Sequence, residues 1–381
     1  MRILYVLNGT FLRGGTEAVI LNYFSHMNRK KIQIDFMLHT TEEEMQSNEI
    51  CQSLIQEGAN IYCVTPRYAG VKQNKQDITK VLMENQFDAI HTHTDAIGSY
   101  ILAIAKKCGI PVRIAHSHNT EVPVKPNTFK NILHWLYLEG CHYSIRRQAT
   151  HYMACSQKAG EWLFGKKAWK EGKVYYLRNG IDLHKYAYNS STRERIKKEM
   201  NLEGKVVLGH VGRFAYQKNH DFIIDVFAQV HKENNNTVLL LVGEGELKSE
   251  IEEKVRQLGL ENAVIFYGVS DHVEDLLQVM DIFVFPSRWE GLGMVLVEAQ
   301  ASGLMCFAPD IDKVSKDSQM TDLIRFLPYD ISSWAKEINT VIANLSHNER
   351  TSDISMVNIK ENRYDIYEEA LCLEKYYLSL L

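Results

Sequence analysis

Short apolar runs alternate with helical stretches along the chain, and this alternation limits the possible folds more than any other feature. In the first half, apolar runs that read as strands recur between helical stretches, at residues 3–7, 34–38, 60–64, 89–91, 112–115, 149–155 and 174–177. Alternation of this kind is typical of βαβ units, which place parallel strands in one sheet. The first half is therefore predicted to form a doubly wound α/β domain.

The same pattern restarts after a charged helix that we predict over residues 191–200. Further strands are predicted at 206–211, 238–242, 264–267 and 282–285, and a run at 305–308 is expected to close the sheet. The chain has 381 residues, which is more than a single hydrophobic core usually serves. We therefore predict a second doubly wound domain after the first.

The predicted fold class is α/β, with two doubly wound, Rossmann-like domains. The domains are expected to span residues 1–180 and 181–360, with a linker near the turn-forming pair Asn179-Gly180. Residues 361–381 are predicted to form a C-terminal helix with one apolar face. This helix could pack back on either domain, and the N-terminal domain is our candidate.

Cysteine usage and the start of the chain indicate a cytoplasmic protein. The seven cysteines are odd in number, widely scattered and without a C-x-x-C pair, which fits reduced thiols rather than a disulfide framework or a zinc site. The chain passes from Met1 directly into the first strand, so we expect no signal peptide. No apolar run approaches the length needed to span a bilayer.

Charge is unevenly distributed between the two halves. Residues 1–180 carry 22 Lys and Arg against 15 Asp and Glu, whereas the remaining residues carry 21 against 32. A basic first half could face anionic lipid or a phosphorylated ligand, or the imbalance could be drift of surface charge. Nothing resembles a nucleic-acid-binding module, so no nucleic-acid partner is expected.

Glycines and cations follow the first strand of each predicted domain. Gly14 and Gly15 stand at the turn into the first helix, where exposed backbone N–H groups can bind an anion or simply form a tight turn. Arg213 and Lys218 follow the strand at 206–211. An Arg can bind a diphosphate in a fork and a Lys as a point charge, although surface positions are common for both residues. We predict that these cations bind phosphate.

Two glutamates flank a glycine-rich loop in the second half. Glu290 is predicted to lie in the loop after the strand at 282–285, and Glu298 one turn into the next helix. Ligands bind at this carboxyl edge of open α/β sheets. Carboxylates are suited to the vicinal hydroxyls of a ribose or a hexose. Together with the cations, this pattern describes a nucleotide-sugar site.

At this point the chain resembles the retaining glycosyltransferases of family 4, which have the GT-B fold. The resemblance covers nearly the whole chain, and the motifs of the second half are specific in combination. The linker at 177–182 resembles the interdomain strand of the family, and residues 154–165 resemble its bacterial capsule and exopolysaccharide branch. The other matching motifs are Gly14-Gly15-Thr16-Glu17, Arg213 and Lys218, Leu241-Val-Gly243-Glu-Gly245, Phe266-Tyr-Gly268, and the Glu290 and Glu298 pair.

The resemblance implies a role for each of these residues in a cleft between the domains. Glu298 would hold the ribose hydroxyls, and Glu290 the hydroxyls of the donor sugar. Arg213 and Lys218 would stabilise the β-phosphate as it leaves. The backbone would contact the base at Gly268 and Val269, the phosphate at Gly15, and sugar and phosphate at Gly291, Leu292, Gly293 and Met294.

Two histidine pairs follow strands of the first domain, His91 with His93 and His116 with His118. In the family one histidine after the later strand faces the donor sugar, and we favour His118, with His116 next. A histidine satisfied in a strand-end turn remains the alternative, above all for His91 and His93. H-x-H can also be a metal pair, but no acidic third ligand has a convincing spacing, so no metal is expected.

Two further segments have an ordinary interpretation beside a functional one. Asp310 and Asp312 imitate the D-x-D metal motif of a different glycosyltransferase fold, and we interpret them as loop acids. Residues 123–147 form a basic amphipathic stretch with aromatic residues, including Lys125, Lys130 and Trp135. This stretch could make a weak contact with an anionic membrane or pack as an ordinary helix on its own domain.

The predicted function is hexosyl transfer from a nucleotide diphosphate sugar, expected to be UDP-linked, with retention of configuration. The expected acceptor is a hydroxyl of a glycan or lipid-linked glycan in bacterial surface polysaccharide synthesis, and no cofactor is expected. The expected location is the cytoplasm, with the inner face of the plasma membrane as a candidate. A GT-B nucleotide-sugar epimerase and a non-catalytic partner subunit that binds nucleotide sugar or lipid are the alternatives.

Overall fold

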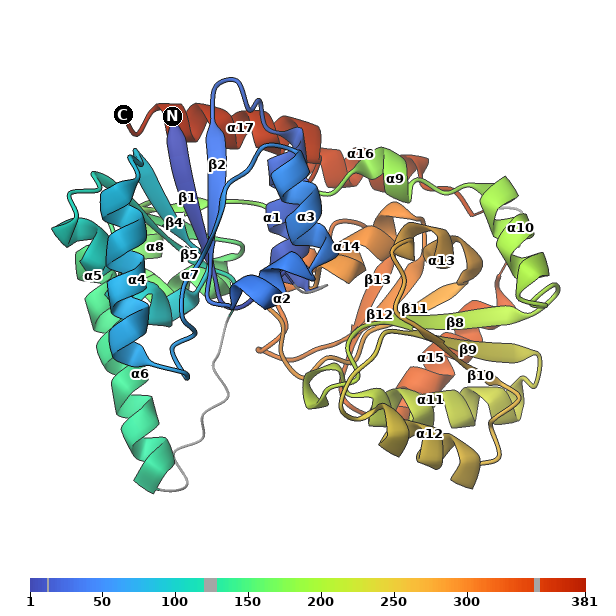
Figure 1. Ribbon diagram of the computed structural model, residues 1–381. Helices are drawn as coiled ribbons and strands as arrows, with labels where there is room; N and C mark the ends of the chain where they lie inside the picture. Colours follow the sequence, from blue (N-terminus) through green and yellow to red (C-terminus); the bar gives the residue numbers. More distant parts are fainter. Residues whose placement is uncertain (12–13, 120–128, 346–349) are drawn as a thin grey trace. The chain divides into compact units, whose positions relative to one another are not determined.

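The structure is a computed structural model, and it describes residues 1–381 except 12–13, 120–128 and 346–349 (Figure 1). By its internal contacts the chain forms two compact units. Unit 1 contains Met1–Gly180 and Ile366–Leu381, and unit 2 contains Ile181–Asp365. Unit 2 thus extends beyond the predicted boundary at residue 360, because the helix Asp353–Glu361 belongs to this unit and crosses that boundary.

Unit 1 is built around a seven-stranded parallel sheet. Its strand order is β3-β2-β1-β4-β5-β6-β7, so β1 lies beside both β2 and β4. This order is that of a doubly wound sheet, in which strands are added outwards in one direction from β1 and in the opposite direction from β4. The strands are β1 (Arg2–Leu7), β2 (Gln33–Leu38), β3 (Ile61–Cys63), β4 (Ala89–Thr92), β5 (Val112–Ser117), β6 (His151–Ala154) and β7 (Val174–Tyr176).

The helices of unit 1 follow the strands as the sequence pattern predicts. They pack apolar side chains such as Ile101, Leu102 and Ile145 into the core beside strand residues such as Leu4 and Ile90. The helices are α1 (Gly15–His26), α2 (Glu42–Gln46), α3 (Glu49–Gln56), α4 (Val71–Glu84), η1 (Asp95–Gly98), α5 (Ser99–Lys107), α6 (Phe129–Gln148), α7 (Gln157–Phe164), α8 (Lys166–Lys170) and α17 (Ile366–Leu378).

The C-terminal helix α17 belongs to unit 1 and packs against α1. The fully buried Tyr377 joins it to the sheet, because its hydroxyl lies 2.6 Å from that of Tyr5 and 2.7 Å from His91 Nδ1. The carboxylate of Glu374 accepts a hydrogen bond from the backbone of Asn28. Buried polar contacts and apolar packing therefore hold α17 on the N-terminal unit.

The basic stretch predicted over 123–147 corresponds largely to α6, which packs against α5. Leu138, Cys141 and Ile145 are buried, as expected for a helix on its own domain. The same helix exposes large apolar side chains, namely Ile132, Leu133, Trp135, Leu136, Tyr137 and Tyr143. Lys125 and the side chain of Lys130 lie outside the described residues. None of the described helices is both long and apolar enough to cross a bilayer, and the membrane contact stays a prediction.

Unit 2 contains a six-stranded parallel sheet with the order β10-β9-β8-β11-β12-β13. The run predicted to close the sheet is β12, but β13 pairs with its outer side and forms the edge, so that prediction was wrong. The strands are β8 (Val206–Val211), β9 (Thr237–Val242), β10 (Val264–Gly268), β11 (Ile282–Val284), β12 (Met305–Pro309) and β13 (Ile324–Leu327).

Both faces of this sheet are buried. Leu239 and Leu241 of β9 enter one apolar cluster, and Leu240 and Val242 enter another, as alternation along a strand requires. The helices of unit 2 are α9 (Leu183–Tyr186), α10 (Ser190–Glu199), η2 (Tyr216–Lys218), α11 (His220–Glu233), α12 (Lys248–Gln257), α13 (Val273–Val279), α14 (Met294–Ala301), η3 (Lys316–Ser318), α15 (Ile331–Ala343) and α16 (Asp353–Glu361).

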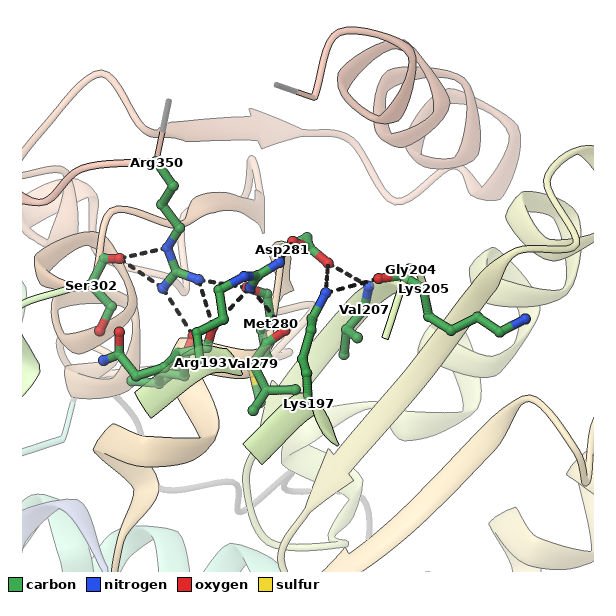
Figure 2. Close-up of polar contacts among 12 residues, drawn as sticks. Arg193, Lys197, Gly204, Lys205, Val207, Val279, Met280, Asp281, Ser302 and Arg350 are labelled. Carbon is green, nitrogen blue, oxygen red and sulfur yellow. Dashed lines mark hydrogen bonds and ion pairs between the residues drawn. The ribbon is translucent and has the colours of Figure 1, made fainter. Parts of the chain in front are cut away.

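A buried charge cluster holds the amino-terminal edge of the unit 2 sheet together (Figure 2). Arg193 Nη2 lies 2.5 Å and Lys197 Nζ 3.2 Å from the carboxylate of Asp281. The guanidinium of Arg350 donates to the carbonyls of Leu277 and Met280 at the end of α13, and to that of Ser302 at the end of α14. Arg350 thus satisfies carbonyls that a helix end leaves without partners.

Candidate functional site

The strand order of unit 2 places its ligand-binding edge where β8 and β11 lie side by side. These parallel strands pair directly, and successive strands are added outwards in one direction from β8 and in the opposite direction from β11. Crevices at such a switch point bind ligands in open α/β sheets. The loop after β8 carries Arg213 and Lys218, and the loop after β11 carries Glu290. The four predicted side chains Arg213, Lys218, Glu290 and Glu298 therefore all lie in unit 2.

Lys218 and Glu290 form an ion pair, with 2.5 Å between Lys218 Nζ and Glu290 Oε1. Both side chains are largely buried, with 19% and 11% of their surface exposed, so solvent screens this pair less than a surface pair. The ammonium of Lys218 also lies 5.1 Å from the centroid of the Phe285 ring. The sequence suggested separate roles for these two residues and did not predict their contact.

Hydrogen bonds connect the loops that carry this pair. The side-chain amide of Gln217 donates to the carbonyl of Trp289, and the backbone N–H of Arg288 donates to the carbonyl of Gln217, each at 2.8 Å. The backbone N–H of Glu290 donates to the carbonyl of Lys313. The loop after β11 is therefore held on one side by Gln217 of the loop after β8 and on the other side by the backbone of Lys313.

Glycines bring the neighbouring loops into close contact. A Cβ at Gly243 would lie 2.2 Å from the carbonyl oxygen of Gly212, and a Cβ at Gly245 would lie 2.4 Å from that of Phe214. Either Cβ would force the β9 loop away from the β8 loop, which carries Arg213 and Lys218. Packing between these loops thus gives a physical reason for glycine at Gly243 and Gly245.

Helix α14 begins directly after the glycine-rich loop. Gly293 has a φ of 75°, precedes the first helical residue Met294 and offers no side-chain cap. The N–H of Leu296 donates to the carbonyl of Gly293, whereas the N–H groups of Met294 and Val295 have no earlier helical carbonyl to bind. A helix N-terminus also favours negative charge. Leu292 is buried in an apolar cluster, which anchors the loop next to Gly291.

Glu298 lies in the second turn of α14, with its side chain near α9. Burial raises the pKa of Glu298 to about 7, and a hydrogen bond from Tyr186 opposes that rise. Tyr186 was not singled out in the sequence, because it precedes Glu298 by more than 100 residues and has no motif of its own. Tyr186 lies at the end of α9, the first helix after the linker between the two units.

The remaining predicted residues of unit 2 are more exposed. Arg213 Nη2 lies 3.0 Å from the carboxylate of Glu246, and 71% of the Arg213 side chain is exposed. Gly268 has a φ of 84° at the end of β10, and the next residue, Val269, is exposed. Arg213 is thus free to reorient, and Gly268 and Val269 place their backbone at the carboxyl edge of the sheet.

The two predicted histidine pairs of unit 1 come together in one cluster. His91 Nε2 lies 3.2 Å from His116 Nδ1, and His93 Nδ1 lies 2.9 Å from His118 Nε2. The rings of His116 and His118 are 3.9 Å apart between centroids. Burial is the main cause that lowers the pKa of all four, that of His118 to about 3, so the cluster is neutral at pH 7.

This histidine cluster contains the residues best suited to hold a metal within the part of the chain that the structure describes. His91, His93 and His116 offer ligand atoms within 4.8 Å of one another. Neutral imidazole is a common metal ligand. His91 is also engaged by Tyr377. The predicted absence of a metal remains a prediction.

Asp95 is a partly buried acid beside the cluster that the sequence interpretation missed. Its carboxylate accepts hydrogen bonds from the backbone N–H of His118 and from the side chain of Asn119, at 2.9 and 2.7 Å. Burial raises the pKa of Asp95 to about 6. Its φ of 46° is unusual for a residue other than glycine. The position directly after the His91–His93 strand was the signal that could have identified it.

After β1, at the same carboxyl edge of the unit 1 sheet, Gly15 is the first residue of α1 and Gly14 is its N-cap. A Cβ at Gly14 would lie 2.5 Å from a carboxylate oxygen of Glu17, a contact that the flexible Glu17 side chain could relieve by moving. The preceding residues 12 and 13 lie outside the described residues.

Asp310 and Asp312 lie in the loop after β12, and Asp310 pairs with Lys316, as loop acids do.

Comparisons with known proteins agree with this geometry. The family model described as "Glycosyltransferase Family 4" matches residues 13–185, and the one described as "Glycosyl transferases group 1" matches residues 192–355. EpsF of Bacillus subtilis (strain 168), named as a glycosyltransferase, is 34% identical over 343 residues, which cover 88% of this chain and 86% of EpsF. A galactosyltransferase of Escherichia coli that acts on GlcNAc-diphosphoundecaprenol is 27% identical over 61% of this chain and 60% of its own.

Solved structures share the fold at low sequence identity. Anabaena HepE in complex with UDP-glucose aligns with a TM-score of 0.76 at 19% identity, over 100% of both chains. Sucrose-phosphate synthase from Thermosynechococcus elongatus aligns with a TM-score of 0.77 at 16% identity, over 100% of this chain and 98% of its own. The predicted pair of Rossmann-like domains is confirmed as the GT-B architecture. The chain is a glycosyltransferase and belongs to glycosyltransferase family 4.

Proposed function

We propose that this glycosyltransferase moves a hexose from a UDP-sugar to a hydroxyl of a glycan or lipid-linked glycan, with retention of configuration, in bacterial exopolysaccharide synthesis. The Lys218–Glu290 pair at the switch point of unit 2 is the observation that carries the donor part of this proposal. The similarity to EpsF and to the UDP-Gal-dependent enzyme of E. coli supports the donor and the pathway class.

Donor binding would separate the Lys218–Glu290 pair. The β-phosphate would take the place of the carboxylate beside Lys218 Nζ, since a phosphate is a stronger partner for the ammonium. Glu290 would then be free to accept hydrogen bonds from hydroxyls of the donor sugar. Arg213, which among the described residues forms an ion pair only with the exposed Glu246, would turn towards the same phosphate. Charge grows on that phosphate as the glycosidic bond breaks, so both cations act most strongly in the transition state.

The rest of unit 2 would hold the nucleotide and the sugar through fixed groups. Glu298 would accept hydrogen bonds from the ribose hydroxyls, and the backbone at Gly268 and Val269 would face the base. N–H groups between Gly291 and Met294 would bind sugar and phosphate. These groups need no rearrangement during the reaction, which is the basis of electrostatic preorganisation.

Unit 1 would supply the acceptor side of the reaction. Gly15 would approach the diphosphate through its backbone, and His118, with His116 as the alternative, would contact the donor sugar. Both imidazoles are neutral at pH 7, because burial lowers the pKa of each. A neutral His118 can donate one hydrogen bond to a sugar hydroxyl without adding charge. No metal enters this proposal, and the leaving phosphate would accept the acceptor proton in a front-face attack.

The proposed place of action is the cytoplasm, where nucleotide sugars are made, with the inner membrane face as the candidate site for lipid-linked acceptors. The exposed apolar side chains of α6 support a weak membrane contact. Lipid vesicles that contain anionic headgroups would retain the wild-type protein on flotation if this contact exists.

The test of the function is turnover across a panel of UDP-sugars with diphosphate-lipid-linked sugars as acceptors. We expect UDP release with one donor, and NMR of the product should show the anomeric configuration of the donor. Lys218→Met should lower kcat about 10²-fold or more, whereas the exposed Lys232→Met on α11 serves as the matched control. Formation of free, epimerised sugar, or UDP binding without turnover, would contradict the proposal.

A further inference from the structure

A cavity of about 480 Å³ lies within unit 1 at the carboxyl ends of three neighbouring strands. Its walls come from the segments after β1, β2 and β3 and from the start of α5, and they include Asn8, Thr10, His39, Arg67, Tyr68 and Tyr100. None of these residues was singled out in the sequence, and none belongs to the donor site of unit 2. The cavity is large enough for a sugar ring or a diphosphate.

Arg67 places a positive charge at this cavity. Its guanidinium lies 5.4 Å from the ring centroid of Tyr100 and 5.0 Å from that of Tyr137. Among the residues that the structure describes, no carboxylate forms an ion pair with Arg67. Flat aromatic neighbours hold the guanidinium in place, and one of its N–H groups is engaged by Tyr137. A guanidinium has five N–H donors, so Arg67 is still suited to bind anionic oxygen atoms in a fork.

The buried amide of Asn74 determines which nitrogen of His39 carries the proton. Asn74 Nδ2 lies 2.7 Å from the carbonyl oxygen of Thr65, which can only accept, so the amide nitrogen faces it. The same nitrogen lies 3.0 Å from His39 Nδ1, and the other amide atom accepts from the hydroxyl of Tyr100. His39 Nδ1 is therefore an acceptor.

The proton of the neutral His39 ring must then be on Nε2. Burial, together with the charge of Arg67, lowers the pKa of His39 to about 4, so the ring is neutral at pH 7. Nε2 is buried and has no hydrogen-bond partner among the described residues. An unsatisfied buried N–H is costly. His39 thus offers a donor beside Arg67 that only a ligand or a water can satisfy.

The cavity also contains one acid among its described walls, Glu44. One of its oxygens, Oε2, accepts from the hydroxyl of Thr40 at 2.5 Å and from the backbone of Thr41 at 3.3 Å, in the capping box of α2. Its other oxygen can accept from a sugar hydroxyl. Tyr68 is 90% exposed, so its ring is available to pack on a sugar.

We infer that this cavity binds the acceptor through an anionic group, with Arg67 and His39 Nε2 as the donors to its oxygen atoms. This inference rests on the proposed function, because it assigns the acceptor of the same reaction. The group is either the diphosphate of a lipid-linked sugar or the carboxylate of an acidic sugar, and both present oxygen atoms to a forked cation. Arg67 and His39 are thus specificity residues for a charged acceptor.

The test is calorimetry with three probes on the full chain: geranyl diphosphate, octyl glucuronide and the neutral octyl glucoside. Saturating UDP is present throughout, so that the phosphate-binding cations of unit 2 are occupied. We expect one anionic probe to bind at least tenfold more tightly than octyl glucoside. Preference for the diphosphate identifies a lipid-linked acceptor, and preference for the glucuronide identifies an acidic sugar.

Arg67→Gln should remove this preference by weakening the anionic probe about tenfold or more, as expected for the loss of a charge-assisted hydrogen bond. His39→Phe should weaken it in the same direction, and Lys107→Gln, an exposed cation on α5, is the matched control. The melting temperature and the affinity for UDP should stay within error of the wild type in all three variants.

Equal binding of all three probes by the wild type, or an unchanged preference in Arg67→Gln, would overturn the inference. A different result would show that the proposed function is wrong: UDP-sugars would neither bind nor turn over, while unit 1 could still prefer the anionic probes. The two outcomes are therefore read from different ligands in the same protein.

Discussion

Glu298 makes nucleotide binding depend on pH in the neutral range. Its pKa is raised to about 7, so about nine tenths of the side chain is ionised at pH 8 and about one tenth at pH 6. Only the carboxylate can accept hydrogen bonds from both ribose hydroxyls. The dissociation constant for UDP should therefore increase about tenfold from pH 8 to pH 6 through this residue alone.

The terminal phosphate of UDP also titrates near this range, so a reference variant is needed. Glu298→Gln has no charge to lose, and its titration with UDP reports only the phosphate. Calorimetry from pH 6 to pH 8 should show a ratio of variant to wild-type dissociation constants that increases with pH and levels off above pH 8. A ratio that stays constant would refute both the raised pKa and the role of Glu298 on the ribose.

The raised pKa of Glu298 also makes the free energy of unfolding depend on pH. Because the folded-state pKa of Glu298 lies above the ordinary glutamate value of 4.5, the folded state binds the proton more tightly than the unfolded chain does. Its contribution to the free energy of unfolding is thus fully present below about pH 4.5 and decreases as the pH rises towards about 7. Glu298→Gln should remove this decrease in urea titrations of the isolated protein.

Three further predictions concern the folded state and the chemistry. Tyr377→Phe should lower the free energy of unfolding by about 1–3 kcal/mol, because Tyr5 and His91 lose a buried partner; a urea midpoint equal to the wild type would count against the assigned contacts. Arg350→Met should cost roughly 2–4 kcal/mol, since the carbonyls at the ends of α13 and α14 lose their donors, and a loss below 1 kcal/mol by the same titration would contradict that role. Dialysis against EDTA should leave the rate of UDP release unchanged if no metal takes part, whereas a loss that Zn²⁺ restores would point to the histidine cluster.

The strands were predictable because their apolar runs are long enough to be buried on both faces. Runs such as 206–211 and 238–242 became β8 and β9 with the predicted bounds almost unchanged. The edge strand β13 was missed because Arg325 interrupts its short apolar run and only Ile324 in it is buried. An edge strand of this kind resembles a loop in sequence and is fixed by pairing with β12.

The position of the site residues at strand ends was predictable, whereas their contacts were not. Glu290 and Lys218 are 72 residues apart, and their ion pair follows from the adjacency of β8 and β11. The histidine cluster arises in the same way, because β4 and β5 pair in register and bring His91 opposite Ile114 and near His116. The order of strands in a sheet is a tertiary property. Residues at the ends of neighbouring strands can therefore come into contact although no spacing in the sequence indicates it.

A crystal structure of the protein with UDP tests the central claim most directly. The account predicts the diphosphate at the β8–β11 switch point, with Lys218 Nζ moved from Glu290 to the β-phosphate and the ribose hydroxyls on the Glu298 carboxylate. UDP bound elsewhere, with the Lys218–Glu290 contact of 2.5 Å intact, would contradict it.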